Sequence, residues 1–176
     1  IGMAKVIGEE GNFDEEGSAL AATMKAPSGV GLRDIEFTEF QGFPDASSKV
    51  NYIGWYPGEG SAYNNPATGR TTVNFDVDGS TDILYSDVAH GARLQPFNIM
   101  TFRHALVKYS VKVYAMEEEG GNVNDFWGQL KAVLFGNMYS QCTLNLPTSY
   151  EDLPEISSSG SATFDKEVTL DKFPVG

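Results

Sequence analysis

The chain contains only two histidines, and they are the first residues to test for catalysis or metal binding. His104 lies in the stretch TFRHALVKYSVKVYA, whereas His90 lies in VAHGAR, which has the composition of a loop. A catalytic histidine needs a nucleophile or a metal to serve, and usually a carboxylate to orient it. No such partner lies near His104 in the sequence, so we expect a packed imidazole bonded to a backbone carbonyl or a side chain.

Three carboxylates surround a glycine-containing turn in DVDGSTD, namely Asp76, Asp78 and Asp82. Calcium prefers several flexible oxygen ligands, which makes these residues candidates for a metal site. Their spacing does not fit an EF-hand loop, which needs ligands at alternate positions and a glutamate at its end. An acidic turn between two strands is therefore the favoured interpretation, and we expect neither metal nor cofactor.

Aromatic side chains gather in VNYIGWYPGEGSAY, where a strand-like stretch meets a glycine-rich loop. Exposed rings with a polar rim can stack on sugars, so Tyr52, Trp55, Tyr56 and Tyr63 are candidate glycan ligands. Large aromatics at the end of a sandwich strand also serve as core residues, and exposed rings are informative only when they form a patch. Both interpretations remain open at this level.

The other patterns do not indicate an enzyme. The 24 acidic residues make carboxylate pairs too common to single out, and no phosphate loop, nucleophile elbow or zinc-helix motif occurs. The one cysteine, Cys142, alternates with Leu144 and Leu146, as expected for a buried thiol in a strand. We expect a non-enzymatic protein.

Composition limits the class of partner. The chain has 176 residues, enough for one core, and 41% of them are hydrophobic. A net charge of −12 with only 12 basic residues argues against binding to nucleic acid or to anionic membrane surfaces. No run of about 18 apolar residues occurs, so we expect no membrane insertion.

Short segments with alternating apolar and polar residues recur between clusters of Gly, Pro, Asn and Asp, a pattern typical of an all-β domain with little or no helix. Only DEEGSALAATMKA also fits helical spacing, and its flanking loops favour a strand. The predicted strands are 2–8, 18–25, 34–41, 49–56, 70–77, 82–86, 99–116, 128–136, 141–146 and 162–170. This number of strands favours a single two-sheet β-sandwich over residues 1–176.

The longest predicted strand, 99–116, shows the clearest alternation. Its odd positions form an apolar row: Ala105, Val107, Tyr109, Val111, Val113 and Ala115. The large apolar residues before His104 lie on the even side, so a bulge, or a strand that serves both sheets, is expected there. We predict that this segment is the central strand of the sandwich, with the odd row facing the core.

The order of these segments resembles that of the fimbrillin-like proteins of Bacteroidetes, the Mfa and FimA type pilins. The resemblance covers about residues 49–146, from VNYIGWYPG through TTVNFDVDGSTDILYSD to LKAVLFGN and SQCTLNL. A central F-x-H-A-L-x-K strand is part of the family's structural signature. It corresponds here to Phe102, His104, Ala105, Leu106 and Lys108.

The resemblance implies a transthyretin-like sandwich of the fimbrillin N-terminal-domain type, exported as a lipoprotein to the outer membrane and cell surface. Such proteins are pilus subunits, tips or anchors, whose partners are other pilin subunits or anchor proteins joined by strand exchange, and host glycans or proteins for adhesive members. Stalk subunits lose an N-terminal strand to a trypsin-like protease, and a strand from the next subunit fills the groove.

The sequence departs from the family pattern at both ends. Residues 1–176 include neither the lipobox cysteine, which would precede residue 1 in a chain that begins after it, nor the second sandwich domain of the family. We therefore expect a small subunit or the first domain of a longer one. Three basic residues lie in the region where the family is processed: Lys5, Lys25 and Arg33.

Overall fold

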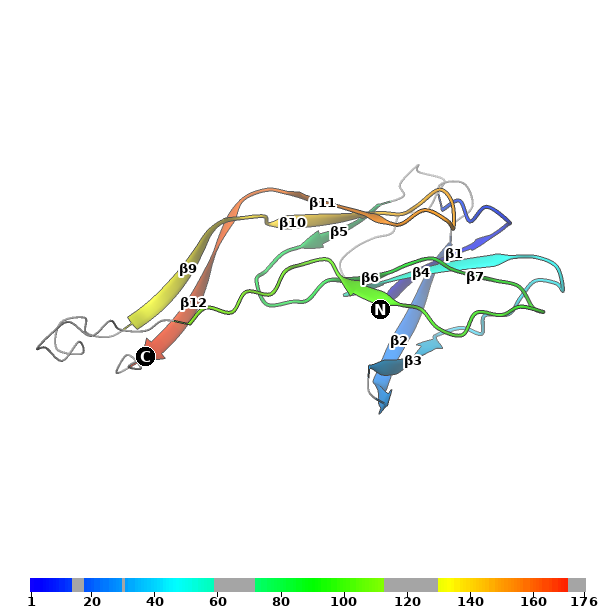
Figure 1. Cartoon of the computed structure of the whole chain (residues 1–176), viewed down its shortest axis with the longest axis horizontal. Coiled ribbons are helices and arrows are strands. Elements are labelled where there is room, and N and C mark those ends of the chain that lie inside the picture. The colour runs from blue at the N-terminus through cyan, green and yellow to red at the C-terminus, as the bar shows by residue number, and fades with distance from the viewer. Residues whose placement is uncertain (14–17, 30, 59–71, 113–129, 171–176) are drawn as a thin grey trace, which may run out of the picture.

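The computed structural model describes residues 1–13, 18–29, 31–58, 72–112 and 130–170, and these residues contain no helix (Figure 1). The all-β prediction is therefore confirmed. The strands are β1 Gly2–Ile7, β2 Ser18–Gly29, β3 Leu32–Phe37, β4 Val50–Tyr56, β5 Thr72–Asp76, β6 Leu84–Ser86, β7 Ala89–Gly91, β8 Phe102–His104, β9 Leu130–Met138, β10 Gln141–Asn145, β11 Glu155–Ser159 and β12 Ala162–Leu170.

The strands form three antiparallel groups. A seven-stranded sheet has the order β3-β2-β1-β4-β6-β8, with β7 also paired to β4. A three-stranded sheet has the order β11-β10-β5, and β9 pairs with β12 in a separate two-stranded ribbon. In Figure 1 the small sheet lies over the large one, as in a β-sandwich, and the ribbon projects from one end.

The main core lies between the two sheets. Alternate residues of β1 and β4 contribute one side, and alternate residues of β5 and β10 contribute the other. The buried members are Ala4, Val6, Phe13, Ile53, Trp55, Val73, Phe75, Ile83, Cys142, Leu144 and Leu146. Cys142 is the buried thiol that its alternation predicted, and burial raises its pKa.

A second apolar cluster covers the other face of the large sheet. Met3, Ala22, Val50, Tyr52 and Ala89 are buried there, and partly buried side chains that include Phe37 and Phe97 pack against them. β1 and β4 are therefore buried on both faces. They are the central strands of this sheet, which explains why β4 reads as a nearly continuous run of buried residues.

The ribbon continues the small sheet beyond a bend. β9 ends three residues before β10 begins, and β11 ends three residues before β12 begins, so both strands break at the same level. Asn137 and Gly160 adopt positive φ at the two breaks, a conformation that Asn and Gly tolerate best. Beyond the bend the ribbon leaves the sandwich (Figure 1).

The predicted central strand 99–116 is wrong over most of its described length. Only β8, with three residues, is a strand, and it lies at the edge of the large sheet beside β6. Val107, Tyr109 and Val111 are 74%, 63% and 54% exposed, whereas Ala105 and Leu106 pack against the main core. β6 begins at Leu84, the residue that faces His104, and past this point Ala105 N donates to Ile83 O before the pairing ends. Residues 113–116 lie outside the described part of the chain.

Candidate functional site: the N-terminal strand

β1 is an N-terminal strand inserted between two others. It pairs along Gly2–Ile7 with β4 and along Gly2–Lys5 with β2, antiparallel on both sides. Such a strand satisfies its own backbone groups and also those of the facing edges of β2 and β4. β1 therefore fills a strand-shaped slot in the sheet.

The side chains of β1 fill both apolar clusters. Met3 belongs to the second cluster, whereas Ala4 and Val6 belong to the main core, and all three are buried. A Cβ atom added at Gly2 would lie 2.2 Å from Trp55 Nε1, so the absence of a side chain there lets the indole lie against the strand. The residue types of β1 thus match the shape of the slot.

The end of β1 is held by polar contacts. Gly8 N donates to Lys49 O at 3.1 Å, and Asn51 Nδ2 donates to Gly8 O at 2.9 Å. Asn51 is completely buried, and its Oδ1 lies 2.6 Å from His90 Nδ1. His90 is in β7, not in a loop as predicted, and Tyr150 stacks on its ring at a centroid distance of 3.9 Å.

This Asn51–His90–Tyr150 group was not identified from the sequence. Asn51 and His90 are 39 residues apart in the sequence, and Tyr150 lies further still along the chain. None of the three belongs to a recognisable motif. The only available signal was a polar residue at position 51 between the apolar residues of a strand that is otherwise fully apolar.

The three candidate processing residues differ in accessibility. Lys5 is half-buried in β1, where its Nζ lies 3.3 Å from Gln41 Oε1 and 5.8 Å from the centroid of the Tyr52 ring. Desolvation lowers the pKa of Lys5. Lys25 is exposed in β2 and forms an ion pair with Glu36. Arg33 is exposed in the edge strand β3, two residues after Gly31.

The structure brings His104 together with Asp82, which the sequence did not suggest. His104 Nδ1 lies 2.8 Å from Asp82 Oδ2, but the imidazole is 70% exposed and is not the packed side chain that was expected. This pair is close to the register point at which Leu84 faces His104. Among the remaining signature residues, Phe102 is half-buried near Gly54, and Lys108 is exposed.

Asp78 and Asp82 have separate partners, and Asp76 is exposed at the end of β5. Asp78 Oδ1 accepts hydrogen bonds from Ser80 N and Thr81 N, and Asp78 Oδ2 accepts one from Thr81 Oγ1. These bonds hold the pKa of Asp78 well below its ordinary value. Asp82 is engaged by His104, and the described residues contain no group of three metal-ligating side chains. The turn interpretation accounts for these contacts.

The candidate glycan aromatics do not form one platform. Tyr52 is buried in the second cluster, between Phe37 and Phe97, whereas Trp55 is buried in the main core on the opposite face of β4. Tyr56 is exposed, and Tyr63 lies outside the described residues. The geometry therefore gives no support to sugar stacking on this set.

The sequence matches no known family model, and neither the curated proteins nor the solved structures contain a match to the chain. In the described part of the chain, no helix is long and apolar enough to cross a membrane.

Proposed function

We propose that this chain is a non-enzymatic fimbrillin-like subunit of a cell-surface pilus, which assembles by β-strand addition. The observation that carries this proposal is the position of β1 between β2 and β4, with its side chains in both apolar clusters. Removal of β1 leaves unpaired N–H and C=O groups along β4, which accept a strand from another subunit.

The slot provides both affinity and register. The edge of β4 along Val50–Trp55 offers its backbone groups to an incoming strand, and pockets vacated by Met3 and Val6 select apolar residues at matching positions. Burying each such side chain is worth about 1.5–3 kcal/mol, so an alternating apolar strand is strongly preferred over a polar one.

The connection between β1 and β2 offers no cleavage point to a trypsin-like protease, because residues 8–17 contain neither Lys nor Arg. Lys5 is paired on both sides within the sheet, and the Lys25 side chain is engaged by Glu36. Arg33, exposed in an edge strand, is the preferred processing residue of the proposal. Cleavage there detaches β2 together with β1, so the incoming strand then pairs along the free edge of β4.

Other features agree with the proposed family. The two-sheet architecture is compatible with the transthyretin-like sandwich of fimbrillins, and a net charge of −12 suits a protein exposed to solvent at the outer membrane surface. Stalk, tip and anchor subunits share the sandwich, and the strand slot is the feature on which a stalk role depends.

Limited trypsin digestion followed by peptide binding tests the proposal. We expect the first cut after Arg33, and we expect the trimmed chain to bind a labelled peptide with the sequence of residues 1–7 or to polymerise. Fluorescence anisotropy measures the first outcome and sedimentation velocity measures the second. A matched peptide in which Met3 and Val6 are replaced by Asp should not bind.

Arg33→Gln serves as the processing control, because it removes the cleavage point and leaves the β1 slot intact. This variant should resist the first cut and bind no peptide after the same digestion. A trimmed wild-type chain that neither binds the peptide nor polymerises, while circular dichroism shows retained β structure, overturns the stalk role.

A further inference from the structure

The segment after β8 combines exposed apolar and basic side chains. Val107, Tyr109 and Val111 are exposed, and they alternate with the exposed Lys108 and Lys112. We call residues 107–112 the basic strip. It contains no acidic residue, although the protein as a whole carries a net charge of −12.

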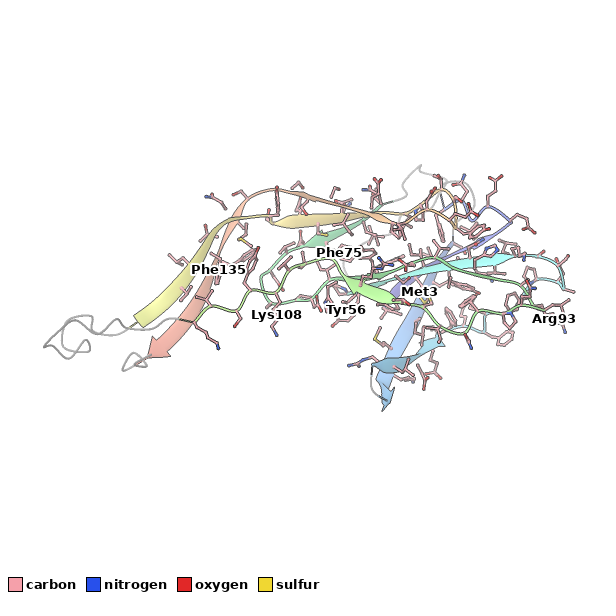
Figure 2. The ribbon with its side chains drawn as sticks, in the orientation of Figure 1. Met3, Tyr56, Phe75, Arg93, Lys108 and Phe135 are labelled. Carbon is pink, nitrogen blue, oxygen red and sulfur yellow. The ribbon has the colours of Figure 1, made fainter. Side chains whose placement is uncertain are left out.

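The basic strip runs beside the two-stranded ribbon. The Tyr109 ring centroid lies 6.5 Å from that of Phe135 in β9, and Figure 2 shows Lys108 near the base of the ribbon. Neither Lys108 nor Lys112 forms an ion pair or a hydrogen bond within the described ranges. Arg103 and His104, just upstream, are instead paired with Asp87 and Asp82.

A surface of opposite charge forms where the turn after β1 meets the connection between β10 and β11. Tyr150 N donates to Glu10 O at 2.7 Å, which joins these two segments. The exposed residues Glu9, Glu10, Glu151 and Asp152 surround Tyr150, and the neighbouring Leu153 is 60% exposed. We call these residues the acidic end. Neither segment contributes a Lys or Arg, since none occurs in residues 8–17 or 147–155.

The two surfaces lie apart on the same molecule. In Figure 1 the ribbon projects at one end of the long axis, and the turns that follow β1 and β10 lie towards the other end. Within its own residues the basic strip carries only basic charges and the acidic end only acidic ones, and both include exposed apolar groups, so the two surfaces complement each other.

We propose that the basic strip docks the acidic end of a second copy of this chain, giving head-to-tail self-association. The contact is heterologous, because the two surfaces differ, so it propagates into a ring or a filament and does not stop at a symmetric dimer. It acts between uncleaved chains, because cleavage after Arg33 would detach Glu9 and Glu10 together with β1. It uses neither the β1 slot nor any cleavage.

Salt dependence distinguishes this contact from purely apolar association. At about 0.1 M salt the Debye length is about 10 Å, which screens the repulsion between two acidic molecules while short-range pairs persist. At about 1 M it falls to about 3 Å, and the pairs weaken. The uncleaved chain at roughly 100 μM should therefore form oligomers in sedimentation velocity at the lower salt concentration and dissociate at the higher one.

Charge reversal identifies the two surfaces. We expect Lys108→Glu/Lys112→Glu to weaken self-association by about tenfold or more, and Glu151→Lys/Asp152→Lys to do the same. An equimolar mixture of these two variants should associate again, because each then offers the surface that the other needs. Arg93→Glu/Gln95→Glu/Asn98→Asp changes the net charge as much as the strip variant does, at exposed residues outside both surfaces, and should leave association unchanged.

A chain that stays monomeric at about 0.1 M salt overturns the docking proposal. The proposal also fails if Lys108→Glu/Lys112→Glu does not weaken association, or if mixing the two charge-reversed variants does not restore it. These outcomes leave the strand-slot function standing, since that function is judged by peptide binding after trimming. Salt-dependent oligomers in a protein whose trimmed form binds no peptide would support docking and remove the strand-slot function.

Discussion

Asn51 Oδ1 and His90 Nδ1 lie 2.6 Å apart, and this contact joins the central strand β4 to β7. Asn51 Nδ2 donates to Gly8 O, which can only accept, so the amide oxygen is the atom that faces His90. His90 therefore carries its proton on Nδ1 and donates it to Asn51. The side chain of one buried asparagine thus ties the end of β1 to two other strands.

Replacing Asn51 with Leu should destabilise the fold by about 2 kcal/mol or more, because Gly8 O and His90 Nδ1 then lose their buried partner. Urea denaturation measures the free energy of unfolding. Asn98→Leu, at an exposed position, is the matched control and should change it by less than about 0.5 kcal/mol. Equal effects of the two substitutions would contradict the role given to Asn51.

Stability should also depend on pH through His90. Burial is the main cause that lowers the pKa of His90 from 6.5, Lys49 adds to the shift, and Glu9 opposes it. Between the lowered folded-state pKa and 6.5, the unfolded chain binds a proton that the folded chain does not. The contribution is therefore complete above about pH 6.5 and is lost as the pH falls through the folded-state pKa.

Denaturation curves at intervals from about pH 7 to pH 5 test this dependence, since most carboxylates titrate lower. The wild-type protein should lose stability across this range, and His90→Gln should have a flatter profile because it removes the titrating group. A profile of the same slope in both proteins would show that other groups cause the loss.

Much of the fold could be predicted from the sequence because alternation reports directly on burial. β4 and β10 appear close to their predicted bounds, and both combine a clear apolar pattern with flanking turn residues. β11 is not among the predicted strands, because its serines give neither strand propensity nor an apolar row. Its partner β10 supplies the pairing that makes it a strand.

For residues 105–112 the error was the reverse: a strand was predicted where the structure has none. Their alternating side chains suit a half-buried strand, but a strand also needs a neighbouring strand long enough to pair with its backbone. The neighbouring strand is too short, because β6 begins at Leu84 opposite His104, and past that point Ala105 N still donates to Ile83 O but no strand follows. Part of the candidate site could not be predicted from the sequence. The position of β1 between β2 and β4 depends on pairing between strands that lie far apart in the chain.

Replacing His104 with Gln should change the free energy of unfolding only slightly, whereas loss of a buried, hydrogen-bonded imidazole would lower it clearly. The His104–Asp82 pair is exposed on both sides, and exposed ion pairs contribute about 0–1 kcal/mol. We expect a change in the free energy of unfolding below about 0.5 kcal/mol in urea denaturation. A loss above about 1.5 kcal/mol would mean that the histidine has a structural role that its exposure does not indicate.

Calcium should not stabilise the protein through the acidic turn. Both carboxylate oxygens of Asp78 accept hydrogen bonds within the turn, and Asp82 is paired with His104. Melting temperatures at zero and about 10 mM calcium should coincide within error. A millimolar site would raise stability by about 1 kcal/mol at that concentration, which calorimetry resolves. Asp78→Ala provides the control, because any rise in melting temperature caused by calcium bound to this turn must be absent from that variant.

Replacing Gly2 with Ala should loosen β1 in its slot. The added methyl group would lie 2.2 Å from Trp55 Nε1, so the indole or the strand must move, and overpacking of this kind costs about 1–3 kcal/mol. Gly136→Ala is the control, because the nearest atom to its new Cβ is Thr163 Oγ1 at 3.8 Å. It should be neutral or slightly stabilising, since Ala is favoured over Gly within a strand. Hydrogen exchange at Met3 and Val6 provides the sharper measurement: it should accelerate in Gly2→Ala only, because β1 then opens more often than the rest of the sheet.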